Sequence, residues 1–247
     1  MPFWVIILIA IVVLVPVLYW CFRYALNRRM AGYAKKVMIS DLRAIRAQMN
    51  PHFIFNSLNS INRYILKNEP EIASDYLGRF AMLMRLVLDN SNHERILLKD
   101  ELETMRLYVE LEQLRFEHNF DYEIEVDESV DTGKLLVQPL IFQPFLENAI
   151  WHGLMHKEEG ERKLNLAIKL VDNNMHCEIT DNGVGRPIEK RESDIKKRSY
   201  GINLVRDRLK FIDPNASVSF EDPKDKDGQA LGTRVILKFK KTEEFSL

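Results

Sequence analysis

Cysteine is scarce in this sequence, and its charges nearly cancel. Cys21 stands inside an apolar run and Cys177 inside a predicted strand, with no paired spacing that would make a zinc site or a disulfide framework. Lysine and arginine total 35 residues against 36 of aspartate and glutamate. Such a balance gives no long-range attraction for nucleic acid, so we expect no direct contact with DNA or RNA.

Charged side chains are missing altogether from Phe3 to Phe22. About 20 apolar residues suffice for a helix to cross the hydrocarbon core of a membrane. Because basic residues follow from Arg23 onward, the positive-inside rule predicts a single transmembrane helix within residues 1–23 and a cytoplasmic location for the remainder. A cleaved signal peptide would need a basic region before the apolar run, which this sequence does not have.

Residues 24–50 are predicted to form a signalling helix that leads away from the membrane, because Leu42, Ile45 and Met49 follow a heptad-like spacing. Pro51 interrupts this pattern, since its ring clashes with the carbonyl four residues back. We therefore expect a kink or a new start immediately before His52.

Two further apolar stripes follow at helical spacing. The first predicts a buried helix face, with His52 on the opposite, accessible face, and is made of Ile54, Leu58, Ile61 and Ile65. The second belongs to a helix expected to start near Pro70, and is made of Ala73, Leu77, Phe80, Met84 and Val87. Two copies of such a hairpin can form a four-helix dimer. We therefore predict that residues 40–118 form the dimerisation and phosphoacceptor region. This region includes a third helical run at Lys99–His118.

Residues 119–247 change to short strand-like segments mixed with helices. Strands are predicted at Tyr122–Val126, Leu164–Val171, Met175–Thr180, Ser217–Glu221 and Thr233–Phe239, and helices at 139–152 and 201–211. A short link at Asp172–Asn174 indicates a hairpin, and the charged segment Pro187–Arg198 indicates a loop. The pattern predicts an α+β domain with helices on one face of a largely antiparallel sheet.

His52 lies in the run QMNPHFIFNSLN at residues 48–59. An accessible imidazole with an ordinary pKa near 6.5 is largely neutral and nucleophilic at cytoplasmic pH. This run resembles the phosphoacceptor motif of LytS-like sensor histidine kinases, a resemblance that implies a bacterial protein of the inner, cytoplasmic membrane in which His52 receives the γ-phosphoryl group of ATP. Many histidine kinases carry an acidic residue directly after the histidine, whereas this sequence has Phe53. The general base that would take the proton of His52 therefore stays open, because the nearest carboxylates, Asp41 and Glu69, are distant along the chain.

A second motif, QPFLENAIWHG at residues 143–153, places Glu147 and Asn148 away from the apolar side of a predicted helix. Alone it would be an ordinary surface pair. With the motif that follows, it resembles the N-box of the GHKL superfamily, a Bergerat-type two-layer α+β sandwich. The resemblance implies that Asn148 helps to hold Mg²⁺ on the phosphates of ATP and that Glu147 is catalytic, polarising a nearby water or attacking group.

The third motif is DNGVG at residues 181–185, directly after a predicted strand. Period-two alternation places Asp181 on the inward face with Cys177 and Ile179, although an Asn-Gly pair is also a common turn signal. The motif resembles the G1 box, which implies that Asp181 accepts from adenine while Gly183 and Gly185 allow close approach of the backbone.

Two later features complete the resemblance to an ATP-binding domain. Ser199–Leu204 is expected to open a helix and resembles a G2 box, so Gly201 is implied to lie near the phosphates. Thr233, at the start of the last strand, is implied to lie near the adenine.

The sequence thus predicts a sensor histidine kinase of a two-component system, a homodimer that uses ATP and Mg²⁺ and passes the phosphoryl group to a response regulator. By the resemblance, that regulator often carries a LytTR-type DNA-binding domain. Two alternatives stay open, a GHKL-fold ATPase and a membrane-tethered pseudokinase that serves as an interaction protein.

Overall fold

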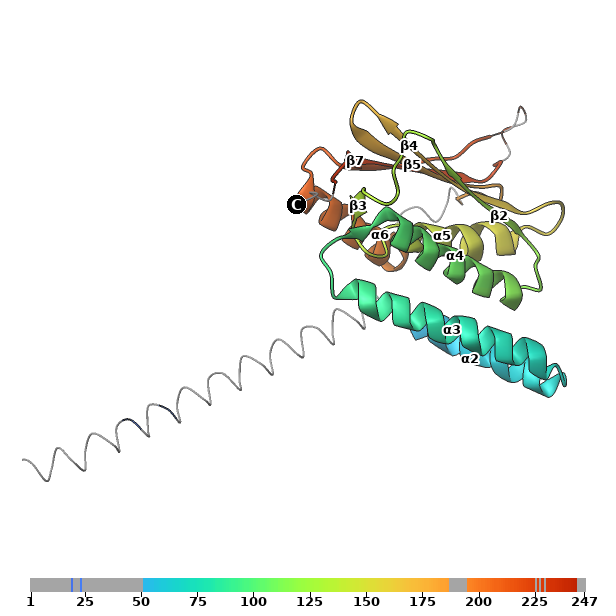
Figure 1. The fold of residues 1–247 in the computed structure, drawn as a ribbon. Coiled ribbons are helices and arrows are strands. Elements are labelled where there is room, and N and C mark those ends of the chain that lie inside the picture. The colour runs from blue at the N-terminus through green and yellow to red at the C-terminus, as the bar shows by residue number, and fades with distance from the viewer. Residues whose placement is uncertain are drawn as a thin grey trace, which may run out of the picture. The chain divides into compact units, whose positions relative to one another are not determined.

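A computed structural model describes residues 19, 23, 51–186, 195–224, 226, 228 and 230–243 (Figure 1). The backbone of Tyr19 and Arg23 is helical, and the rest of the expected membrane and signalling helices lies outside the described residues. Among the residues that are described, no helix is long and apolar enough to cross a membrane. The backbone of His52 is described, but the accessible orientation predicted for its side chain lies outside the description.

The described residues from Pro51 onward alternate helices and short strands. The helices are α2 (Pro51–Leu66), α3 (Pro70–Ser91), α4 (Leu98–Arg115), α5 (Gln143–Asn148) and α6 (Ile195–Ile212), with a π-helical turn η1 (Ala149–Gly153) and a 3-10 turn η2 (Leu154–His156) after α5. The strands are β1 (Ile96–Leu97), β2 (Asp121–Val126), β3 (Leu136–Val137), β4 (Lys163–Val171), β5 (Asn174–Asp181), β6 (Ser217–Glu221) and β7 (Thr233–Lys240).

Five strands form one sheet in the order β2-β4-β5-β7-β6, in which β2 is parallel to β4 and all other neighbours are antiparallel. Along β5 the alternate residues Met175, Cys177, Ile179 and Asp181 are buried, as period-two alternation requires for a sheet covered on one face. Helices α4, α5 and α6 lie along this covered face (Figure 1). The predicted α+β class is therefore confirmed, whereas the boundaries predicted between domains stay predictions.

The hairpin predicted after β4 is present and has a two-residue turn. Asp172 and Asn173 both have positive φ, 48° and 64°, which matches the twist that such tight turns need. The short side chains of aspartate and asparagine tolerate this conformation better than most residues. The turn fixes the register of β4 against β5, which places Leu164 opposite Asp181.

The buried face of α2 differs in part from the predicted one. Ile61 is buried as predicted, but Leu58 is 49% exposed and Ile65 59% exposed, whereas Phe53 and Tyr64 are buried. The ring of Phe53 lies 5.1 Å from that of Tyr108 on α4, and the Tyr64 hydroxyl donates to the carbonyl of Leu114 at 2.6 Å. Aromatic rings bury more area than the aliphatic side chains, and the hydroxyl adds a specific bond, so the aromatic face packs inward.

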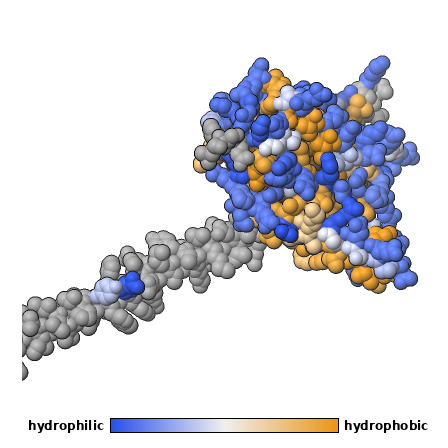
Figure 2. All heavy atoms as spheres, viewed as in Figure 1, coloured by the Kyte–Doolittle hydropathy of each residue, from blue (hydrophilic) through white to orange (hydrophobic). Residues whose placement is uncertain are grey.

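The second helix begins at Pro70 as predicted, but its buried stripe is also shifted. Ala73 and Val87 are buried as expected, while Leu77 is 50% exposed and Tyr76 and Leu83 are buried instead. Both helices thus keep a second apolar stripe on the outside, and Figure 2 shows apolar side chains reaching the surface along the edge where Figure 1 draws the hairpin.

Two helix boundaries were predicted wrongly. The helix expected at 139–152 is α5, and it begins only at Gln143. Leu140 has a φ of 58°, which does not fit a helix, and the carboxylate of Glu101 accepts from the backbone N–H groups of Leu140 and Phe142. Those donors are therefore withheld from a helix. The helix expected at 201–211 begins earlier, at Ile195, within the segment predicted to be a loop.

Candidate functional site

Asp181 ends β5 as a nearly fully buried carboxylate. Its Oδ1 accepts from the backbone N–H of Gly183 at 2.9 Å, and Thr233 lies directly opposite it in the register of β5 against β7. Burial raises the pKa of Asp181 to about 6, while the backbone N–H groups of Gly183 and Thr233 lower it. The structure therefore brings together Asp181, Gly183 and Thr233, as predicted.

Glycines form the walls around this carboxylate. A Cβ added to Gly153 would lie 2.6 Å from Asp181 Oδ1, and a Cβ on Gly183 would overlap the backbone of Gly153. At Gly232 the φ is 118° and a Cβ would overlap the carbonyl of Asp181. A side chain would displace the Asp181 carboxylate at Gly153 and backbone at Gly183 and Gly232, so the close approach of three chain segments requires glycine. Gly153 and Gly232 thus join the site beside the predicted Gly183.

Hydrogen bonds hold the DNGVG segment against the end of the α5–η1–η2 run. The backbone N–H of Val184 donates to the carbonyl of Gly153 at 3.2 Å, and Lys157 Nζ donates to the carbonyl of Asn182 at 2.9 Å. Gly185, with φ 69°, adopts a backbone conformation that favours glycine. The two motifs predicted to share one site are therefore in direct contact.

The side chains of Glu147 and Asn148 are half-buried at the end of α5, opposite the buried Phe145 and Leu146. This arrangement is the one predicted. Asn148 Nδ2 donates to the carbonyl of Pro144 at 2.5 Å, so the amide is anchored to its own helix and its oxygen is the atom suited to a cation. Their roles in Mg²⁺ binding and in catalysis remain predictions.

Gly201 does not open a helix, contrary to the expectation for a G2 box. It lies inside α6, after Ile195 and well past the N-terminal N–H groups that could bind a phosphate. A Cβ on Gly201 would lie 3.4 Å from Cβ of Pro144. Gly201 therefore marks the contact of α6 with α5, and a place for it near the phosphates stays a prediction.

Phe53, the residue after His52, is buried. Its ring lies against Tyr108 of α4 and 6.2 Å from the ring of Phe80. The position that carries an acid in many histidine kinases is thus used here to attach the start of α2 to α4.

The sequence reading missed three polar residues of α4 and its surroundings. Glu101 is fully buried and binds the segment before α5, while Glu112 is almost fully buried and lies beside Arg115. Burial raises the pKa of both carboxyl groups to about 7. Arg115 in turn lies over the ring of Trp151, 4.0 Å from its centroid. Charged residues on a helix usually face solvent, so the sequence offered no signal for their burial.

Known proteins match this chain in both its helical and its mixed part. Residues 40–120 match the family model described as "Histidine kinase". The sensor protein LytS of Enterococcus faecalis is 30% identical over 158 residues, which cover 64% of this chain and 26% of that protein. The sensor histidine kinase YpdA of Escherichia coli is 29% identical over 177 residues, with 70% and 30% covered. This chain is a relative of the LytS-like sensor histidine kinases.

This chain spans only about a quarter to a third of the length of those two proteins. The Bacillus subtilis protein YwpD is 29% identical over 187 residues, and there the match covers 74% of this chain and 66% of YwpD. Among solved structures, the catalytic domain of the histidine kinase ThkA has 17% identity and a TM-score of 0.42, with 61% of this chain and 97% of that chain covered.

Replacing Gly183 with alanine should disrupt the Asp181 site, because the new Cβ would overlap the backbone of Gly153. We expect a loss of stability of about 1–3 kcal/mol from the strain, measured by chemical unfolding. Gly78→Ala is the matched control, since Gly78 lies within α3 with no atom within 4 Å of an added Cβ. That change should stabilise the protein by about 0.5–1 kcal/mol. Equal effects of the two substitutions would contradict the tight packing described for Gly183.

Proposed function

We propose that this chain is the kinase core of a membrane-anchored sensor histidine kinase of a two-component system. It binds Mg·ATP in the α+β domain, phosphorylates His52 and passes the phosphoryl group to an aspartate of a response regulator of the LytTR type. The observation that carries the proposal is the buried carboxylate of Asp181 within walls of glycine, held against the α5–η1 segment.

The residues around Asp181 fit an adenine nucleotide. A buried carboxylate needs a donor, and the exocyclic amino group of adenine supplies one. Gly153, Gly183 and Gly232 let the chain segments around Asp181 pack closely, so the site is shaped by backbone and not by side chains. Asn148, with its amide oxygen, would hold Mg²⁺, which supplies charge neutralisation on the phosphates when bound.

The transfer itself needs a neutral imidazole and an acceptor for its proton. A ring nitrogen of His52 attacks the γ-phosphorus, the bond to the bridging oxygen breaks, and ADP leaves. Because Phe53 is buried against Tyr108, we assign the proton to Glu147, the half-buried carboxylate next to Asn148.

The outer face of the hairpin supports assembly as a homodimer. Leu58, Ile65, Leu77 and Leu88 are between 40% and 59% exposed, and they recur at helical spacing on α2 and α3. Apolar stripes of this kind are buried when a second hairpin completes a four-helix bundle. Membrane anchoring rests on the apolar run at residues 3–22 and on the relationship to sensor proteins.

Wild-type protein incubated with Mg²⁺ and γ-labelled ATP should acquire an acid-labile, base-stable label, which is the behaviour of a phosphohistidine. His52→Gln should abolish the label, and His93→Gln, a change at an exposed histidine after α3, should retain it. Label that persists in the His52→Gln protein would contradict the proposal. Phosphate release without a stable label would favour the ATPase alternative.

Nucleotide affinity should weaken as the pH falls through about 6. Asp181 has a raised pKa of about 6, and the adenine amino group binds the ionised form better than the protonated one. Between pH 7 and pH 5 we expect the affinity attributable to Asp181 to fall about tenfold. Titration calorimetry of wild type against Asp181→Asn separates this effect from protonation of ATP itself. A pH dependence that is the same in both proteins would show that Asp181 does not contact the nucleotide.

A further inference from the structure

Glu112 is a buried carboxylate in the last turn of α4. It is 1% exposed, and its Oε2 lies 3.7 Å from Nη1 of Arg115. Trp151 contributes a side-chain hydrogen bond to it. Burying an ion pair is costly, and apolar residues of similar volume are often as stable or more so. The arrangement therefore calls for a reason other than stability.

Trp151 connects this ion pair to Glu147. It lies four residues after Glu147, about one turn further along the α5–η1 segment. The guanidinium of Arg115 lies 4.0 Å from the centroid of its ring, and the ring of Phe116 meets it edge-on at 5.3 Å. Cation–π and edge-to-face contacts of this geometry hold an aromatic ring in one orientation. The turn that follows Glu147 is thus fixed by the end of α4.

Arg115 and Tyr108 of α4 also contact α2, the helix that carries His52. Arg63 of α2 donates from Nη2 to the carbonyl of Arg115 at 2.9 Å, and Phe53 lies against Tyr108, one turn before Glu112. Glu112 therefore lies between the phosphoacceptor helix and the turn that follows Glu147.

The titratable groups that interact with Glu112 come from three helices. Arg115 and Tyr108 are on α4, Glu147 is on α5 and Tyr76 is on α3. Burial raises the pKa of Glu112 to about 7; Arg115 and the Trp151 hydrogen bond lower it, and the charge of Glu147 raises it. The two carboxylates are therefore electrostatically coupled.

We propose that Glu112 is a positioning residue for the transfer to His52: through Arg115 and Trp151 it fixes the place and the charge environment of Glu147. This inference rests on the proposed function. Glu112 supplies the counter-charge of Arg115, and without it the guanidinium is left to compete for Glu147, the other carboxylate that is coupled to this cluster. A Glu147 paired with Arg115 would accept a proton less readily.

The test is a double-mutant cycle in the full chain, with kcat of His52 phosphorylation and KM for ATP as readouts. Glu112→Gln should lower kcat about tenfold and change KM less than about twofold, because the nucleotide site itself is untouched. Glu147→Gln should lower kcat by about 10²-fold or more. The double variant should be no slower than Glu147→Gln, since Glu112 acts only through Glu147.

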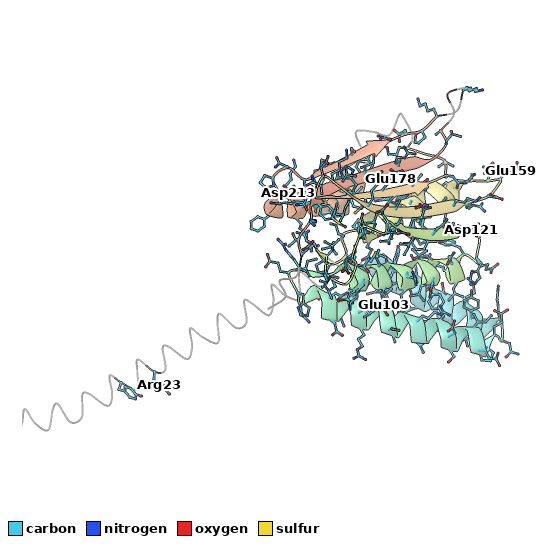
Figure 3. The ribbon with its side chains drawn as sticks, turned by 45° about the horizontal axis from the view of Figure 1, so that its top comes forward. Arg23, Glu103, Asp121, Glu159, Glu178 and Asp213 are labelled. Atoms are coloured by element: carbon cyan, nitrogen blue, oxygen red, sulfur yellow. The ribbon has the colours of Figure 1, made fainter. Side chains whose placement is uncertain are left out.

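Glu103→Gln is the matched control, because Glu103 is an exposed residue of the same helix and its loss changes the net charge equally (Figure 3). It should keep the wild-type kcat. Trp151→Phe preserves an aromatic ring but removes the N–H donor, and it should lower kcat without a further loss in the Glu147→Gln background. This second variant keeps the test decisive if Glu112→Gln folds poorly.

A further tenfold loss of kcat when Glu112→Gln is added to Glu147→Gln would overturn the inference, and so would an effect on KM alone. Failure of the proposed function looks different. In that case Glu147→Gln phosphorylates His52 at the wild-type rate, or the wild type does not label His52 at all.

Discussion

The structure depends on the burial of one wide side of α4. This side receives Phe53 and Tyr64 from the hairpin, and it also presents Glu101 to the segment before α5 and Arg115 to Trp151. Because the core is close-packed, α4 cannot move relative to one neighbour without disturbing the other. The helix that carries His52 and the helix that carries Glu147 are thus attached to one element, which gives a physical route by which a change in the hairpin could reach the segment around Asp181 proposed to bind nucleotide.

The proposed nucleotide site depends on glycines, that is, on the absence of side chains. Gly153, Gly183 and Gly232 let three chain segments meet around Asp181, so that the buried carboxylate accepts from the backbone N–H groups of Gly183 and Thr233 and keeps further acceptor capacity. A group held in this way is pre-organised, because its orientation does not have to be fixed when a ligand binds. It is also costly to ionise, which is why its pKa is raised and why a donor from a ligand would stabilise it.

Much of this could be predicted from the sequence because the determinants are local. Period-two alternation placed Asp181 inward, the Asp172–Asn173 turn marked a hairpin, and Pro70 marked the start of α3. The inner face of α2 was predicted only in part: Ile61 is buried, but Phe53 and Tyr64, whose contacts with α4 lie far away in sequence, replace Leu58 and Ile65. The burial of Glu112 and the early start of α6 depend on partners distant in sequence, which a local pattern cannot contain.

The central claim is that nucleotide bound beside Asp181 delivers its γ-phosphoryl group to His52. Mass-spectrometric mapping of the phosphorylated residue, with digestion and separation kept at alkaline pH, tests it most directly. The account predicts that the phosphate lies on the peptide containing His52 after incubation with Mg·ATP, and that Asp181→Asn protein carries none. A phosphate on a different residue, or equal phosphorylation of His52 in the Asp181→Asn protein, would contradict it.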